Sequence, residues 1–154
     1  GAGGRWWSCW SRVRPGASEG SASAARRAAE DTRVDKGCIG ANDKDLAQCG
    51  RGDRVVQIIR KGMQVRNAEG VRAKFGVDPE LIPDLLALVG DAQDGYPGIR
   101  GIGPSTAATL LNRHGSIEPF PPGVLAAARE HAPPLQTQAT LRTAAPSFAW
   151  ASAL

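Results

Sequence analysis

Two pairs of aspartates have the residue type and spacing for metal chemistry. Asp43 and Asp45 are separated by one residue, so on an extended segment both side chains face the same way. Asp91 and Asp94 are three residues apart, which lets them converge on a helical turn. A divalent cation such as Mg²⁺ would neutralise the repulsion within each pair, and two such ions can hydrolyse a phosphodiester. Either pair alone is also typical of ordinary helix caps and turns.

A glycine-rich turn and a helix start follow Asp94 closely, in the segment 96–111 with the sequence YPGIRGIGPSTAATLL. Its glycines permit backbone angles closed to other residues, and Pro104 suits the first position of a helix. This is the sequence form of a helix-hairpin-helix, whose backbone N–H groups bind phosphate whatever the base. We therefore expect salt-sensitive DNA binding. The expected DNA contacts are Gly98, Arg100, Gly101, Gly103, Ser105 and Thr106.

Two other interpretations of this glycine-rich segment were weighed. A plain helix–turn–helix corner without a ligand stays open. A dinucleotide site is disfavoured, because the segment lacks the third glycine and the preceding strand of that fingerprint.

Periodicity and punctuation predict the elements that must position these residues. The β-branched run 54–59 fits a strand. Asp78 can cap a helix that has Pro79 in its first turn and ends at Gly90. The expected helices are 22–31, 68–75, 79–89, one from 104 onward and 124–131, and the expected strands are 34–39, 54–59 and 64–66.

Four regions follow from this pattern. Residues 1–23 are dominated by Gly, Ser, Ala, Arg and Trp without periodicity, so we expect them to be irregular and poorly ordered. Residues 24–76 are expected to form a partial α/β catalytic core. Residues 77–131 form the helix-hairpin-helix module, and residues 132–154 an extended tail.

Composition narrows the function classes. The chain has 154 residues, a formal net charge of +4 and three cysteines without a CxxC pair. The basic balance is compatible with nucleic acid. The lack of a CxxC pair argues against zinc, and an odd number of cysteines without a signal peptide argues for a reducing compartment. No apolar run reaches transmembrane length, so we expect no membrane partner. The expected location is the bacterial cytoplasm.

In order and spacing, these motifs closely resemble the 5′→3′ exonuclease family, which includes the 5′-nuclease domain of bacterial DNA polymerase I and is related to flap endonucleases. The matching segments are 42–48, 75–77, 86–98 and the hairpin, within residues 24–125. The resemblance implies an α/β fold: a partial, mainly parallel sheet with flanking helices, a PIN-like remnant, plus the α-helical helix-hairpin-helix module.

The resemblance also implies metal-dependent hydrolysis of DNA at a 5′ end, nick or flap, in DNA replication and repair. Mg²⁺ or Mn²⁺ would be bound by Asp43, Asp45, Asp91 and Asp94. Backbone carbonyls of the hairpin, which contains Gly98, Gly101 and Gly103, would bind K⁺.

The chain departs from the family pattern in three places. The family's first half, with its own acidic ligands, has no counterpart. The family's Glu-Ala-Asp-Asp cluster corresponds to residues 16–19, where Glu19 is the one acid, and Ser105 stands where a basic residue is common. We therefore expect weak DNA binding and poor or no cleavage from this chain alone. An exonuclease fragment, a DNA-binding module without catalysis and a degraded gene product without a stable fold all stay open.

Overall fold

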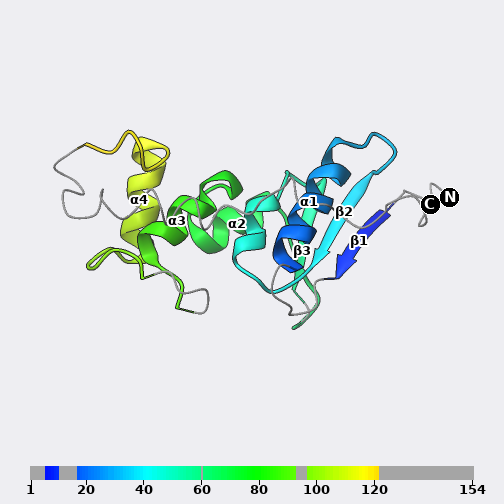
Figure 1. Ribbon diagram of the computed structural model, residues 1–154, viewed down its shortest axis with the longest axis horizontal. Coiled ribbons are helices and arrows are strands. Elements are labelled where there is room, and N and C mark those ends of the chain that lie inside the picture. The colour runs from blue at the N-terminus through cyan, green and yellow to red at the C-terminus, as the bar shows by residue number, and fades with distance from the viewer. Residues whose placement is uncertain (1–5, 11–16, 60, 93–96, 122–154) are drawn as a thin grey trace. The chain divides into compact units, whose positions relative to one another are not determined.

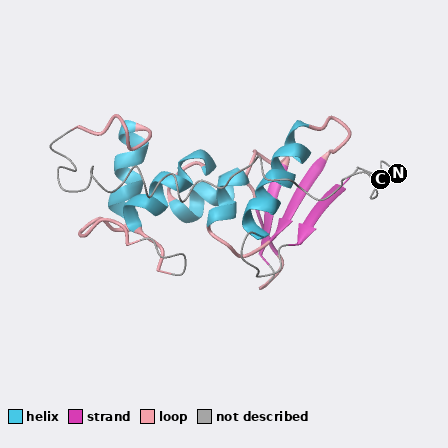
Figure 2. Ribbon diagram, viewed as in Figure 1, coloured by secondary structure: helices cyan, strands magenta, loops and turns pink. Residues whose placement is uncertain are grey.

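The computed structural model describes residues 6–10, 17–59, 61–92 and 97–121 (Figure 1). These residues divide into two compact units, the first extending to Gly70 and the second beginning at Val71. The boundary expected at residues 76 and 77 lies inside the second unit. The first unit combines a sheet with helix, and the second unit is helical (Figure 2).

The first unit is built on a mainly parallel sheet, as expected. Its strands are β1 (Trp6–Trp10), β2 (Lys36–Gly40), β3 (Val55–Ile59) and β4 (Gln64–Arg66), in the order β1-β2-β3-β4. The first three strands are parallel, and β4 pairs with β3 in the antiparallel direction.

Helix α1 (Ala17–Glu30) lies against this sheet (Figure 1). Ala22, Ala25 and Ala28 recur every three residues on one helix face, and each is at most 1% exposed. Their small side chains bring the helix close to the sheet, where Ile39 and Val55 complete the core. The alanine-rich run therefore supplies both helix propensity and a flat packing face.

The expectation that residues 1–23 are irregular is wrong for two segments. Residues 6–10 form β1, which pairs with β2 from Trp6↔Lys36 to Trp10↔Gly40. Strands of a parallel sheet need not alternate apolar and polar residues, so periodicity gave no signal. Helix α1 begins at Ala17 rather than residue 22, although Gly20 lowers helix propensity. Burial of Ser21 and Ser23 explains how tertiary packing outweighs that local preference.

The second unit contains most of α2 (Ala68–Phe75), then η2 (Pro79–Leu81), α3 (Ile82–Val89) and α4 (Pro104–His114). Helices α3 and α4 pack together. The buried apolar residues of this unit are Val71, Val77, Ile82, Leu85, Leu86, Ala87, Leu88, Ala107, Leu111, Ile117 and Phe120. The predicted helix 68–75 and the end of α3 at Gly90 are confirmed.

Asp78 occupies the predicted N-cap position, but the prediction that its side chain caps the helix is wrong. Asp78 precedes η2, but its side chain makes no cap hydrogen bond. Instead, its Oδ1 accepts a hydrogen bond from Arg72 Nε at 2.8 Å. The charged guanidinium competes with the backbone amides for the same carboxylate oxygen.

Helix α4 is tied to the end of α2 at Gly76. Asn112 Nδ2 donates to the Gly76 carbonyl at 2.7 Å, and a Cβ at Gly76 would lie 2.9 Å from that of Ala108. The predicted helix 124–131 and the tail 132–154 lie outside the described residues. Within the described ranges, none of the helices is long and apolar enough to cross a membrane.

Candidate functional site

Residues 41–45, here called the carboxylate loop, follow the carboxyl end of β2 and lead into η1 (Asp45–Cys49). Asp43 is half-buried and Asp45 is 7% exposed. The Asp45 amide donates to Asp43 Oδ1 at 3.2 Å. Lys44 between them is helical, with φ −66° and ψ −37°, so the extended geometry assumed from the spacing is wrong. A tight turn, rather than a strand, places the Asp45 amide against the Asp43 carboxylate.

A buried amide that the sequence reasoning missed holds this loop. Gln57 on β3 is 3% exposed, and its Nε2 donates to the Asp43 carbonyl at 2.7 Å. Its Oε1 accepts from Arg66 Nη1 at 3.2 Å. Gln48 Nε2 also donates to the Asp45 carbonyl at 2.8 Å. The available signal was one polar residue in the middle of the β-branched run VVQII.

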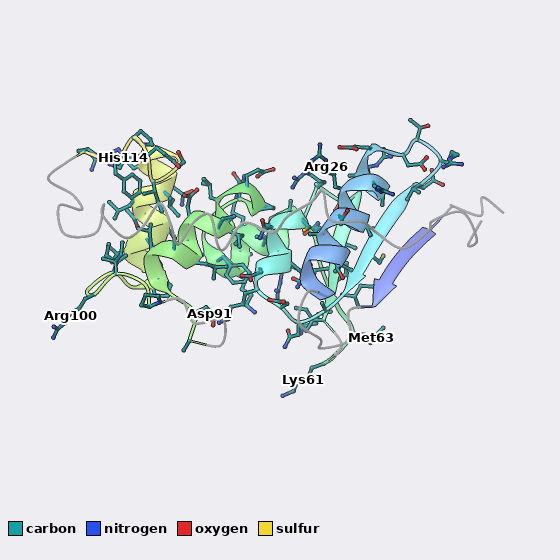
Figure 3. All side chains as sticks on the ribbon, viewed as in Figure 1. Arg26, Lys61, Met63, Asp91, Arg100 and His114 are labelled. Carbon is teal, nitrogen blue, oxygen red and sulfur yellow. The ribbon has the colours of Figure 1, made fainter. Side chains whose placement is uncertain are left out.

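The second predicted pair is described in part. Asp91 follows Gly90, which ends α3 with φ +84° and donates its amide to the Leu86 carbonyl at 2.8 Å. Asp91 is 5% exposed. Its side chain is labelled in Figure 3. Asp94 lies outside the described residues. Asp43 and Asp45 belong to the first unit and Asp91 to the second, so convergence of the four carboxylates stays a prediction.

The hairpin is anchored to the last turn of α3. Ile99 donates its amide to the Leu88 carbonyl at 2.8 Å, which satisfies an acceptor that the helix end leaves open. Gly98 has φ +64°, and a Cβ there would lie 2.4 Å from the Val89 carbonyl oxygen. Only glycine tolerates this approach, because the contact is with backbone that cannot move aside.

The tip of the hairpin is a tight turn at the surface. The Ile102 amide donates to the Ile99 carbonyl at 3.0 Å, and Gly101 within this turn has φ +87°. Gly101 and Gly103 are exposed, and a Cβ at either would meet open space. The side chain of Arg100 extends away from the ribbon (Figure 3). The predicted glycine turn is therefore present and accessible.

Helix α4 leaves its positive end accessible beside this turn. It spans 11 residues, begins with Pro104, and has no side-chain cap at Gly103. Ser105 and Thr106 in its first turn are exposed. The first amides of a helix have no intrahelical acceptor, so this end of α4 presents donors and a partial positive charge to an anion.

The unit that carries the hairpin also contains a carboxyl group with a perturbed pKa. Asp84 in α3 is 3% exposed, and its Oδ1 is buried without a hydrogen-bond partner. Burial raises the pKa of Asp84 to about 6, against the opposing effect of the Ile117 backbone amide and with a smaller contribution from Glu118. No role for Asp84 was expected from the sequence.

The chemistry of the predicted ligands fits a hard divalent cation. Asp43, Asp45 and Asp91 offer carboxylate oxygens, and Asp45 and Asp91 are nearly buried, where a negative charge is costly unless a positive charge compensates it. Among the described residues, no cluster of three or more His, Cys, Asp or Glu side chains has metal-binding geometry.

The part of the chain that carries the hairpin matches a known protein family. Residues 77–152 match the family described as 5′-3′ exonuclease, C-terminal SAM fold. Residues 77–152 are thus similar to the C-terminal domain of 5′-3′ exonucleases.

Two curated relatives extend this match. The chain is 49% identical over 76 residues to a 5′-3′ exonuclease of Aquifex aeolicus, an alignment that covers 49% of this chain and 26% of that protein. It is 41% identical over 81 residues to DNA polymerase I of Bacillus caldotenax, which covers 51% of this chain and 9% of the polymerase. The alignments thus span about a quarter or less of these curated relatives.

Solved structures support the fold. Bacteriophage T5 5′-exonuclease with bound divalent zinc ions matches with a TM-score of 0.69 and 19% identity, over 81% of this chain and 50% of that chain. A complex of bacteriophage T5 flap endonuclease with DNA and metal ions matches with a TM-score of 0.68 and 18% identity, over 81% and 50% of the two chains. The expected α/β fold, a partial sheet with flanking helices plus a helical module, is confirmed, and the helical module matches a SAM fold.

Proposed function

We propose that this chain is part of a metal-dependent 5′→3′ exonuclease. In this proposal the hairpin and the start of α4 hold duplex DNA, and Asp43, Asp45, Asp91 and Asp94 bind Mg²⁺ or Mn²⁺. The observation that carries the proposal is the exposed glycine turn beside the uncapped start of α4, within a segment of 5′-3′ exonuclease ancestry.

The hairpin would contact the DNA backbone rather than the bases. The donors around Gly101 to Thr106 are main-chain amides, which bind phosphate oxygens without reading sequence. Arg100 and the formal net charge of +4 add a long-range attraction that salt weakens. Carbonyl groups of the same hairpin would bind K⁺.

The carboxylates would hold the metal that does the chemistry. When bound, the ion supplies Lewis acidity and an activated water for attack on the phosphodiester. The chain's own part is to fix the ligands: the turn at Lys44 orients Asp43 and Asp45, and the Gly90 end of α3 orients Asp91. The setting would be DNA replication and repair in a bacterial cytoplasm.

A flap-cleavage assay tests this proposal. The full chain would be incubated with a 5′-labelled flap duplex and Mg²⁺ or Mn²⁺. We expect slow release of short products that a chelator abolishes and that Asp43→Asn or Asp91→Asn lowers at least about tenfold. Glu69→Gln, which alters an exposed carboxylate of α2, is the matched control and should leave the rate unchanged.

A second candidate is a DNA-binding module without catalysis. It is favoured by one observation: the hairpin is complete within the second unit, whereas the predicted ligands are shared between two units. Calorimetry separates the candidates. DNA binding together with no detectable Mn²⁺ binding would support the module and contradict the nuclease.

A further inference from the structure

Gln57 is a polar residue in a position that a sheet normally gives to an apolar one. It lies in β3, a strand with neighbours on both sides, opposite Ile39 of β2 and Arg66 of β4. Burying an amide is costly unless its groups are hydrogen-bonded, and both ends of this amide have partners. These two hydrogen bonds therefore explain why a glutamine is tolerated at this buried position.

The orientation of the Gln57 amide is fixed by the chemistry of those partners. The Asp43 carbonyl can only accept, so it must face the amide nitrogen, at 2.7 Å. The Arg66 guanidinium can only donate, so it must face the amide oxygen, at 3.2 Å. Exchanging the two ends would break both bonds at once, which leaves a single arrangement of this side chain.

We propose that Gln57 is a positioning residue for the carboxylate loop. It fixes the peptide unit of Asp43, the residue whose carboxylate also receives the Asp45 amide. One buried side chain thereby sets both predicted ligands, and Arg66 holds that side chain in place. The metal-binding consequence rests on the proposed function, whereas the positioning of the loop does not.

Two variants of Gln57 and one control test the two hydrogen bonds of the amide. Gln57→Glu keeps an acceptor for Arg66 but has no donor for the Asp43 carbonyl. Gln57→Met has a similar length and loses both bonds without adding charge. Gln64→Met is the matched control, because Gln64 is exposed on the neighbouring strand β4.

The experiment has two readouts on the full chain. The first is Mn²⁺ affinity, measured by the electron paramagnetic resonance signal of free Mn²⁺. Loss of a group that orients a ligand lowers metal affinity about 10-fold or more, so we expect at least about tenfold weaker binding in both Gln57 variants. The second is amide hydrogen exchange over the carboxylate loop, residues 41–45, with the β2 amides as an internal reference. We expect faster exchange there in both Gln57 variants and no change in Gln64→Met.

The possible outcomes distinguish the positioning role of Gln57 from its link to metal binding. Unchanged exchange in the loop, or an equal increase in the loop and in β2, would overturn the positioning role. Faster loop exchange with unchanged Mn²⁺ affinity would overturn the link to the metal. If the unmodified chain binds no Mn²⁺ while Gln57→Glu still loosens the loop, the positioning role stands and the metal part of the proposed function fails.

Discussion

The hairpin and the carboxylate loop are held in place by different interactions. The hairpin presents backbone amides, and the loop presents the carboxylates of Asp43 and Asp45. The hairpin depends mainly on the backbone preferences of consecutive residues, its positive-φ glycines and the proline at the helix start, and one hydrogen bond from Ile99 to Leu88 anchors it. The carboxylate loop depends on a side chain 14 residues away, that of Gln57. The sequence therefore reveals the geometry of the hairpin, whereas for the carboxylate loop it reveals the aspartates but not the tertiary hydrogen bond that holds them.

The largest effect should come from Gly98→Ala. The new Cβ would lie 2.4 Å from the Val89 carbonyl oxygen, at a residue with φ +64°. We expect the free energy of unfolding of the chain's second unit to fall by more than about 3 kcal/mol, because backbone strain and an immovable contact add. Denaturation followed by circular dichroism measures this. An unchanged transition would mean that local backbone geometry does not define the hairpin.

Asp84→Asn tests whether the second unit, which carries the hairpin, also depends on groups distant in sequence. The Asp84 carboxyl lies against the Ile117 backbone amide. A folded pKa of about 6, above the ordinary 3.8, means that the proton stabilises the fold. That stability is full below about pH 4 and is lost as the pH rises through 6. Relative to Asp84→Asn, the unmodified chain should lose about 1–2 kcal/mol between pH 4 and pH 7.

Denaturant unfolding of both proteins at several pH values measures this difference. Glu118 is the neighbouring charge that contributes to the shift, so Glu118→Gln should reduce the pH dependence slightly. Glu80→Gln, at an exposed residue of η2, is the control. If stability varies with pH in the same way in the unmodified chain and in Asp84→Asn, the pKa of Asp84 is not raised in the folded state.

Gly101→Ala should have a smaller effect than Gly98→Ala. Its φ is +87°, but a Cβ would meet nothing within 4 Å. Only the left-handed backbone opposes the substitution, so we expect a loss of about 1 kcal/mol in unfolding free energy. The same denaturation measurement applies. Equal losses for the two glycine variants would show that the contact with Val89 contributes nothing.

The smallest effect is expected for Arg100→Gln. This exposed side chain would interact with phosphate through charge, without fixing the hairpin. Duplex binding measured by fluorescence anisotropy at several salt concentrations should weaken a few-fold, and the salt slope should fall by about one. The melting temperature should not change. An unchanged salt slope would place Arg100 outside the DNA interface.

Local sequence signals predicted most of the described elements. Strands 54–59 and 64–66, the helix 68–75 and the helix that starts at Pro104 are confirmed within about a residue. Periodicity failed at β1 and at the start of α1, where pairing with β2 and burial of Ser21 and Ser23 outweigh local preference. The geometry of Asp43 and Asp45 was wrong because spacing alone does not distinguish a strand from a turn.

The sequence by itself determined the family likeness, the hairpin and the identity of the candidate ligands. These depend on residues near one another in the chain, whose glycines, prolines and acids have fixed local meanings. Only the tertiary structure decided the role of Gln57, the raised pKa of Asp84 and the strand at Trp6–Trp10. Each of these arises from burial or hydrogen bonding between segments distant in sequence, and a linear pattern does not record which distant groups meet.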